Sequence, residues 1–172
     1  MNPVTTSPLE VAEILNLLLA DEYLLYATTR SFCAQASASE FRILRRLFQQ
    51  QHTQIAGWID EIAAQARTIR VVARTKWTAL TRLAPISAPR SMNMRPEHML
   101  SELIAGHDEI LIQLHADREA CGGRLNAGST AAFLETLIER HQQAVAELRS
   151  RCAPDEQKYR TLSRPELELQ KA

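Results

Sequence analysis

Helix-breaking residues occur at few places in this 172-residue chain. A proline inside a helix removes a hydrogen bond and clashes with the preceding turn, so long stretches without one are free to form long helices. Four such stretches contain no proline beyond a first turn, and their apolar residues recur every three to four positions: 7–33, about 37 or 39 to 67, 96–122 and 129 or 130 to 152. Their boundaries carry typical start and stop signals, such as Ser7 before Pro8 and Pro154 after the last stretch. The sequence therefore predicts an all-α fold.

The long connection between the second and third helices decides the topology. Residues 68–96 contain Pro85, Pro89 and Pro96 and cannot form one helix, although a short helix over about 76–83 would place Trp77 and Leu80 on one face. Two long helices, a crossover of nearly thirty residues and two more long helices give the ferritin-like connectivity of a four-helix bundle. We expect a single domain over residues 1–152 and a loosely attached tail over 153–172.

Composition excludes several classes of protein. The chain is 45% hydrophobic with a mean hydropathy of −0.22, and no apolar run approaches the roughly 20 residues of a membrane span. The N-terminus lacks the charged start and apolar stretch of a signal peptide, so we expect a cytoplasmic protein without membrane contact. Three cysteines form no CxxC pair, which favours reduced thiols.

Charge is unevenly distributed although the formal net charge is zero. Residues 38–95 hold ten Arg or Lys against three acidic residues, a local balance of +7. Such a segment suits phosphates, yet a solvated helix face is the more common explanation. The tail over 153–172 has four basic and four acidic residues, so no basic arm favours DNA binding.

Four polar residues interrupt the apolar stripes of the four predicted helices, at spacings of three, four or seven from apolar neighbours: Glu22, His52, His107 and His141. Burying one such group without a partner costs several kcal/mol. Antiparallel packing would bring all four to a similar height, because each lies near the middle of its helix. Imidazole and carboxylate together suit iron, with zinc or manganese as alternatives, so the sequence predicts a metal site inside the bundle.

Further ligands for this site are Gln49, one turn from His52, and Asp108, next to His107. The carboxylate-rich di-iron pattern, with Glu-x-x-His on two helices, is only half present, because Gln49 and Ile138 stand where the glutamates belong. A second iron would be poorly neutralised. The alternative is that these histidines are ordinary core groups that hydrogen-bond one another.

Several segments resemble the Dps family of miniferritins: residues 14–32, Phe48, 58–62, 77–83, 99–107 and 137–141. The resemblance covers about residues 9–152 and is most specific at 14–32 and 58–62. It implies a homo-oligomer, a hollow dodecamer of four-helix subunits with the short crossover helix at a dimer interface. Family members oxidise Fe(II), usually with hydrogen peroxide, store the ferric product and sometimes bind DNA.

The ferroxidase ligands of that family lie between subunits, and this chain departs from them. The family's histidines fall on Cys33 and Arg45, its first acidic ligand on Gln49 and its last on Ala64, while Asp60 keeps an acid. An arginine would repel Fe(II) and could pair with Asp60 instead. We therefore expect the intersubunit ferroxidase centre to be lost. A cysteine at position 33 also allows zinc binding or peroxide sensing.

Two functions remain. The first is a Dps-like cage subunit that binds iron or a related divalent metal inside its bundle, with ferroxidase activity if the site is open. In that site Glu22 would bridge or neutralise the metal, His52 and His141 would be terminal ligands, and His107 or Asp108 would complete the coordination shell. The second is a non-catalytic cage, structural or DNA-associated, that has lost ferroxidase activity. Substituting His52 separates them, since the first loses bound metal.

Overall fold

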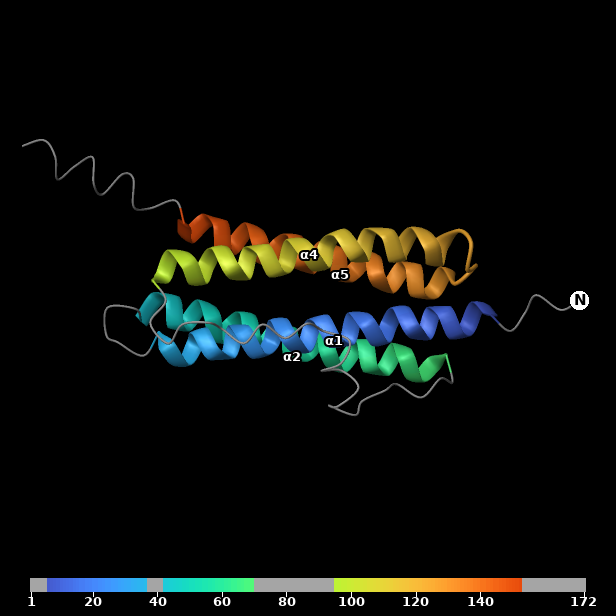
Figure 1. Cartoon of the computed structure of the whole chain (residues 1–172), viewed down its shortest axis with the longest axis horizontal. Coiled ribbons are helices and arrows are strands. Elements are labelled where there is room, and N and C mark those ends of the chain that lie inside the picture. Colours follow the sequence, from blue (N-terminus) through green and yellow to red (C-terminus); the bar gives the residue numbers. More distant parts are fainter. Residues whose placement is uncertain (1–5, 37–41, 70–94, 153–172) are drawn as a thin grey trace, which may run out of the picture.

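The computed structural model describes residues 6–36, 42–69 and 95–152. These residues form four helices: α1 (Thr6–Gln35), α2 (Arg42–Thr68), α4 (Pro96–Gly122) and α5 (Gly128–Cys152). Within the described ranges no residue belongs to a strand. The predicted all-α four-helix bundle is confirmed, and the predicted boundaries agree with the observed ones to within a few residues (Figure 1). The predicted short helix over 76–83 and the tail over 153–172 lie outside the described residues.

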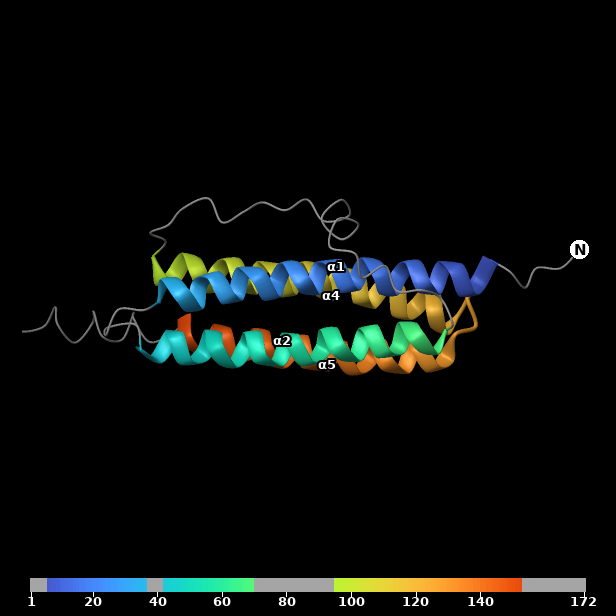
Figure 2. The same ribbon diagram turned by 90° about the horizontal axis from the view of Figure 1, so that it is seen from below.

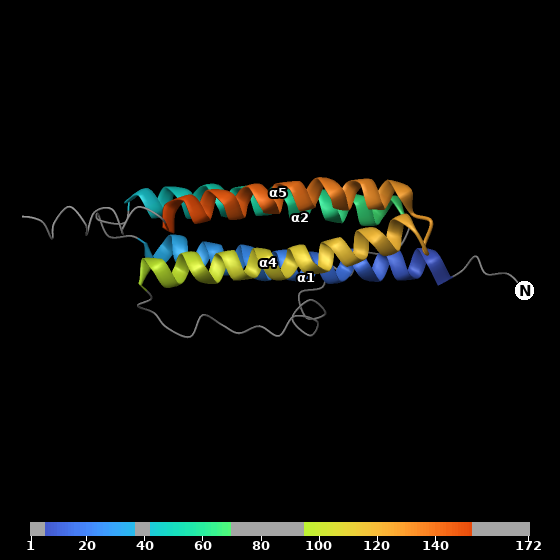
Figure 3. The ribbon, with the colours of Figure 1, turned by 90° about the horizontal axis from the view of Figure 1, so that it is seen from above.

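Two helical hairpins pack side by side to make the bundle. The first joins α1 to α2 and the second joins α4 to α5, and α1 lies beside α4 while α2 lies beside α5 (Figures 2 and 3). The last residue of α2 and the first residue of α4 are at opposite ends of the bundle (Figure 1). A connection between these two helix ends must run the length of the bundle, and this long crossover is the ferritin-like topology predicted from the proline distribution.

Local sequence fixes the ends of the second hairpin. Pro96 occupies the first turn of α4, and Arg95 before it is extended, with φ −68° and ψ 148°, as a residue preceding proline prefers. After α4, the Gly123 N–H donates to Glu119 O at 3.0 Å. Asn126 then adopts a left-handed φ of 50°, which asparagine tolerates better than most residues. This turn directs the chain back into α5.

The core consists of one continuous apolar cluster along the bundle axis. Phe32 and Phe48 are fully buried, with ring centroids 6.1 Å apart, and Leu15, Leu103 and Leu134 are equally inaccessible. Burying each such side chain contributes about 1.5–3 kcal/mol. The hairpins approach closely at Gly106, where an added Cβ would lie 3.0 Å from Leu25 Cδ1. Among the described helices, none is long and apolar enough to cross a membrane.

Candidate site at the bundle centre

Three of the four predicted polar residues meet in the middle of the core. His141 of α5 stands between Glu22 of α1 and His107 of α4, and each of the three side chains is at most 1% exposed. His141 Nε2 lies 2.7 Å from Glu22 Oε1, and His141 Nδ1 lies 2.9 Å from His107 Nδ1. The three residues therefore form a hydrogen-bonded chain, here called the Glu22–His141–His107 chain, that links helices of both hairpins.

The positions of the protons in the Glu22–His141–His107 chain follow from which atoms can only accept a hydrogen bond. A carboxylate oxygen accepts, so the His141 Nε2–H donates to Glu22 Oε1. Burial, and secondarily the neighbouring His141, lower the pKa of His107 to about 3, which keeps His107 neutral near pH 7. A single proton between the two Nδ1 atoms completes the second hydrogen bond.

Trp58 of α2 supplies the fourth side of the site. Its ring centroid is 4.8 Å from that of His141 and 6.4 Å from that of His107, so the indole packs against both imidazoles. Trp58 is 7% exposed and shields the Glu22–His141–His107 chain from water. Trp58 is not among the predicted site residues, although its spacing of three from Ile55 and four from Ile62 places it on the same buried stripe.

His52 takes no part in the Glu22–His141–His107 chain. It is half-buried at the edge of the α2 stripe, and its ring packs edge-on against the ring of Tyr26, at a centroid distance of 5.8 Å. The fully buried residue at this level is Gln51, whose Nε2–H donates to Glu147 Oε2 at 3.2 Å. Successive residues of a helix point about 100° apart, so the phase of α2 turns Gln51 inward and His52 sideways.

The two additional predicted ligands, Gln49 and Asp108, also lie away from the Glu22–His141–His107 chain. Gln49 is exposed on α2. Asp108 is half-buried and accepts a hydrogen bond from Arg149 Nη2 at 3.0 Å. Neither side chain is hydrogen-bonded or ion-paired to Glu22, His107 or His141.

The residues of the bundle centre do not match a di-iron centre. In the described part of the chain, no group of three or more His, Cys, Asp or Glu side chains is arranged to hold a metal ion. Glu22 and His107 bond to opposite nitrogens of His141, so the three form a row. A single carboxylate also cannot neutralise two ferrous ions. Glu22 Oε2, however, is buried without a hydrogen-bond partner among the described residues, and a carboxylate oxygen is able to bind a cation.

The positions that correspond to the family's intersubunit ligands lie on the outside of the subunit. Arg45, Gln49, Asp60 and Ala64 are all exposed on α2, and Cys33 is half-buried near the end of α1. Cys33 Sγ lies 3.8 Å from Arg45 O, which brings these two positions together as the resemblance implies. Asp60 is the one acidic residue among the five.

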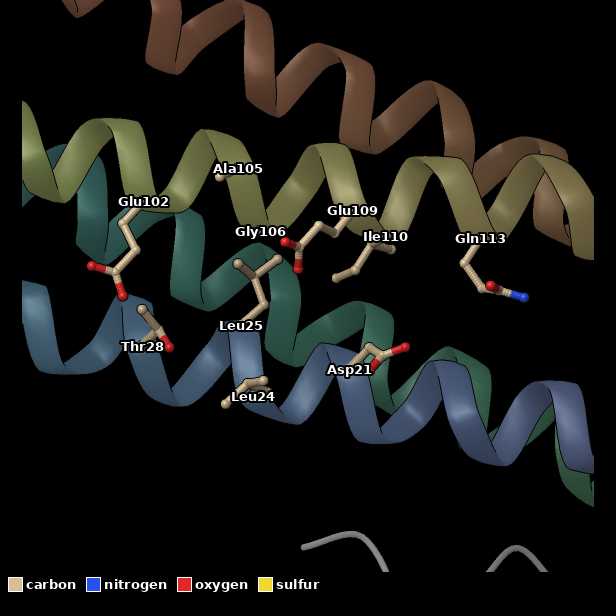
Figure 4. A pocket seen from close by; sticks show the side chains of 10 residues that line it. All are labelled: Asp21, Leu24, Leu25, Thr28, Glu102, Ala105, Gly106, Glu109, Ile110 and Gln113. Atoms are coloured by element: carbon tan, nitrogen blue, oxygen red, sulfur yellow. The ribbon is translucent and has the colours of Figure 1, made fainter. Parts of the chain in front are cut away.

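A separate pocket of about 540 Å³ opens between α1 and α4 (Figure 4). Its walls are acidic, with Asp21 on α1 and Glu102 and Glu109 on α4, around an apolar floor that includes Leu25 and Ile110. Burial, and then the charges of Glu22, Glu109 and Asp117, raise the pKa of Asp21 to about 6. The pocket therefore concentrates negative charge on a different face of α1 from Glu22.

Comparison with known proteins identifies the same fold. Residues 12–154 match the model of the ferritin-like domain family. An uncharacterized low temperature-induced protein of Nostoc sp. is 26% identical over 140 residues, which cover 81% of this chain and 78% of the relative. A homologue from Anabaena variabilis matches to the same extent.

Among solved structures, Dps proteins superimpose over most of the chain. Dps from Thermosynechococcus elongatus matches with a TM-score of 0.80 and 23% identity, over 88% of this chain and 96% of that one. Dps from Vibrio cholerae, described as a member of a broad superfamily of ferritin-like diiron-carboxylate proteins, matches with a TM-score of 0.77 and 23% identity, over 87% and 95%. At these identities the likeness is one of fold.

Proposed function

This chain belongs to the ferritin-like family and has the fold of the Dps proteins. We propose that it assembles with copies of itself into a closed shell. We propose further that this shell does not oxidise Fe(II) at the intersubunit position used by the Dps family. The proposed shell is a dodecamer, as the resemblance implies. The role is that of a non-catalytic cage, and its cytoplasmic location stays a prediction.

The observation that carries this proposal is the chemistry of the exposed α2 face. A ferrous centre needs several oxygen or imidazole ligands with enough negative charge to neutralise the ion. Among the five positions that the resemblance assigns to ligands, Asp60 is the one acid, Arg45 and Gln49 replace a histidine and an acid, and Ala64 has no donor atom. A fixed guanidinium charge at position 45 opposes the binding of a cation.

Two measurements on the purified full-length chain test the proposal. Sedimentation velocity should give a closed oligomer many times heavier than the 19.4 kDa subunit. Fe(II) added with oxygen or hydrogen peroxide should then disappear no faster than in protein-free buffer. A monomer in the first experiment, or rapid saturable oxidation in the second, would contradict the proposal.

A second candidate function is a metal site inside the bundle, and Glu22 Oε2 is the observation that favours it. A buried carboxylate oxygen without a partner is costly, and a bound cation would satisfy it. Glu22, His107 and His141 would be the ligands for iron, or for zinc or manganese, after the hydrogen bond between the two imidazoles opens. An iron in that place would supply redox chemistry with oxygen or peroxide.

Elemental analysis separates the two candidates. The chain is purified, and its metal content per subunit is measured before and after loading with Fe(II) in air, beside His141→Ala and His52→Ala. The second candidate predicts near-stoichiometric metal that is lost in His141→Ala and kept in His52→Ala, because His52 is not part of the Glu22–His141–His107 chain. Metal-free protein in every sample would exclude the metal site inside the bundle and would leave the non-catalytic shell as the proposed function.

A further inference from the structure

The pocket between α1 and α4, called here the acidic pocket, contains negative charges without a positive partner. Glu102 and Glu109 stand on its α4 wall and Asp21 on its α1 wall, and no Arg, Lys or His is among its described lining residues (Figure 4). Neither glutamate forms a hydrogen bond or an ion pair with another described residue, whereas Glu61 and Asp108 each pair with an arginine. Like charges repel one another, so a positive group in this pocket would be stabilised.

The segment that joins α2 to α4 carries charge of the opposite sign. Residues 70–94, called here the basic crossover, hold five Arg or Lys and no Asp or Glu. They lie outside the described residues, but the described chain on either side of them stops at Ile69 and resumes at Arg95. Five cations in 25 residues need either solvent or a set of carboxylates around them.

The charges of the bundle favour one of two routes for the basic crossover. Because α2 and α4 are diagonal to each other, a segment that joins them passes either α1 or α5 (Figures 2 and 3). Along α5 it would approach Arg140, Arg149 and Arg151. Along the groove between α1 and α4 it would meet the carboxylates of the acidic pocket instead. Charge complementarity therefore selects the α1 and α4 side.

Two contacts set the height of the acidic pocket in the bundle. The rings of Tyr26 and His52 are 5.8 Å apart at their centroids, which aligns α1 with α2. A Cβ at Gly106 would lie 3.0 Å from Leu25 Cδ1, which aligns α1 with α4. At a rise of about 1.5 Å per residue, the last residue of α2 lies about 20 Å along the bundle axis from Glu109.

The basic crossover is long enough to reach both glutamates. An extended chain covers about 3.3 Å per residue, so Lys76 can lie about 23 Å from the end of α2, at the height of Glu109. At the other end, Arg90 comes five residues before Arg95, and Glu102 lies about 10 Å into α4. The long side chains of lysine, arginine and glutamate cover the remaining lateral distance.

The floor of the acidic pocket suits the apolar residues of the same segment. Leu24, Leu25 and Ile110 line this floor. Trp77 and Leu80 are three positions apart, so one helical turn would place both on the same side. Apolar surface that is covered in this way is removed from water, which adds to the attraction between the charges.

We propose that the basic crossover occupies the acidic pocket of its own subunit. Lys76 pairs with Glu109, and Arg90 pairs with Glu102. Trp77 packs on the apolar floor between these two ion pairs. The hydrogen bonds between charged groups fasten the segment to α4, and the chain itself neutralises the positive charge that would otherwise suit phosphates.

This inference does not depend on the proposed shell, because both partners belong to one subunit. A monomeric chain would contradict the shell and would leave the basic crossover in its pocket.

Carbodiimide cross-linking of the full-length chain tests the position of Lys76. The reagent activates a carboxylate, and an amine in contact with it then forms an amide bond without a spacer. The chain has three lysines, of which Lys76 is the one within residues 70–94. Peptide mass spectrometry should find Lys76 linked to Glu109, or to Asp21 on the opposite wall. Lys76→Arg should remove this link, because a guanidinium is not coupled.

The same experiment distinguishes the other possible occupants of the acidic pocket. In a co-assembly of unlabelled and ¹⁵N-labelled chain, the two linked peptides should always carry the same label, and a mixed pair would mean that a second copy fills the pocket. A link from Lys76 to Glu139 or Glu147 would place the segment along α5. A link from Lys158 or Lys171 to the pocket would place the C-terminal residues there. Each of these results, or no link at Lys76, would overturn the proposal.

Limited digestion with chymotrypsin tests the two ion pairs. The enzyme cleaves after aromatic residues, and Trp77 is protected while the segment is held in the pocket. Glu102→Gln/Glu109→Gln keeps side-chain size and removes both charges, so cleavage after Trp77 should become about 5-fold faster. Glu119→Gln/Glu139→Gln removes two charges at exposed positions outside the pocket and should leave the rate unchanged. Equal rates in the wild type and both variants would overturn the proposed pairing.

Discussion

At the residue scale, the burial of Glu22 and His141 makes them depend on each other. Both are fully inaccessible, and removing one partner of a buried pair leaves the other unsatisfied. We expect His141→Leu to lower the free energy of unfolding by about 3–5 kcal/mol. The triple variant Glu22→Leu/His107→Leu/His141→Leu removes every polar member and should be less destabilised than that single variant. Urea denaturation of the wild type and the two variants measures the difference, and a triple variant destabilised as much as His141→Leu, or more, would contradict this coupling.

Asp21 gives a prediction for pH dependence. Its pKa in the folded chain is about 6, above the ordinary aspartate pKa of 3.8, so between these pH values the folded state holds more protons than the unfolded state. The stability contributed by the protonated carboxyl is present at low pH and is lost as pH rises through 6.

Asp21→Asn should therefore stabilise the chain at pH 8 by about 1 kcal/mol, a figure reduced for solvent screening of a half-buried group. The same substitution should have little effect at pH 4. Thermal unfolding of both proteins at the two pH values checks this, and an equal shift at both would show that charge accumulation around Asp21 is not the cause.

At the element scale, α2 shows what the sequence can and cannot predict. Its limits and its buried stripe follow from apolar spacing, and the same spacing placed Glu22, His107 and His141 correctly inside the bundle. His52 and Gln51 differ by a single step of about 100°, and both are compatible with the stripe. Only the packing of α2 against α1 and α5 decides that Gln51 faces inward. The order of the Glu22–His141–His107 chain, and the place of Trp58 against it, likewise depend on three-dimensional contacts.

Gly57→Ala tests helix propensity in α2. The added methyl group meets nothing within 4 Å, so better helix propensity should raise the free energy of unfolding by up to about 1 kcal/mol. Urea denaturation of the variant beside the wild type measures this effect, and a less stable variant would contradict it.

At the scale of the whole molecule, the ferritin-like fold is kept although Arg45, Gln49 and Ala64 occupy positions that the Dps resemblance assigns to iron ligands. The bundle topology depends on helix lengths, the crossover and the apolar core, and none of these requires Arg45, Gln49 or Ala64 to be a metal ligand. Ligands can therefore be exchanged on the exposed face of α2 without disturbing the core. The fold alone does not establish iron oxidation.

Restoring the family's ligands should restore the chemistry if the interface is retained. The variant Cys33→His/Arg45→His/Gln49→Asp/Ala64→Glu returns imidazoles and acids to four positions and keeps Asp60. We expect it to bind Fe(II) and oxidise it faster than the wild type. Isothermal titration with Fe(II) under argon, followed by exposure to oxygen, measures both steps. The absence of Fe(II) binding by an assembled variant would mean that these positions do not converge between subunits.

The most direct measurement of the central claim is the rate of Fe(II) oxidation by the assembled wild-type chain, followed with hydrogen peroxide or oxygen as oxidant. A closed oligomer that leaves this rate at the level of protein-free buffer is the predicted result, because the α2 face offers one carboxylate and a fixed positive charge. A rate that rises with protein concentration and saturates with Fe(II) would contradict a non-catalytic shell. Loss of that rate in His141→Ala would then place the chemistry at the bundle centre.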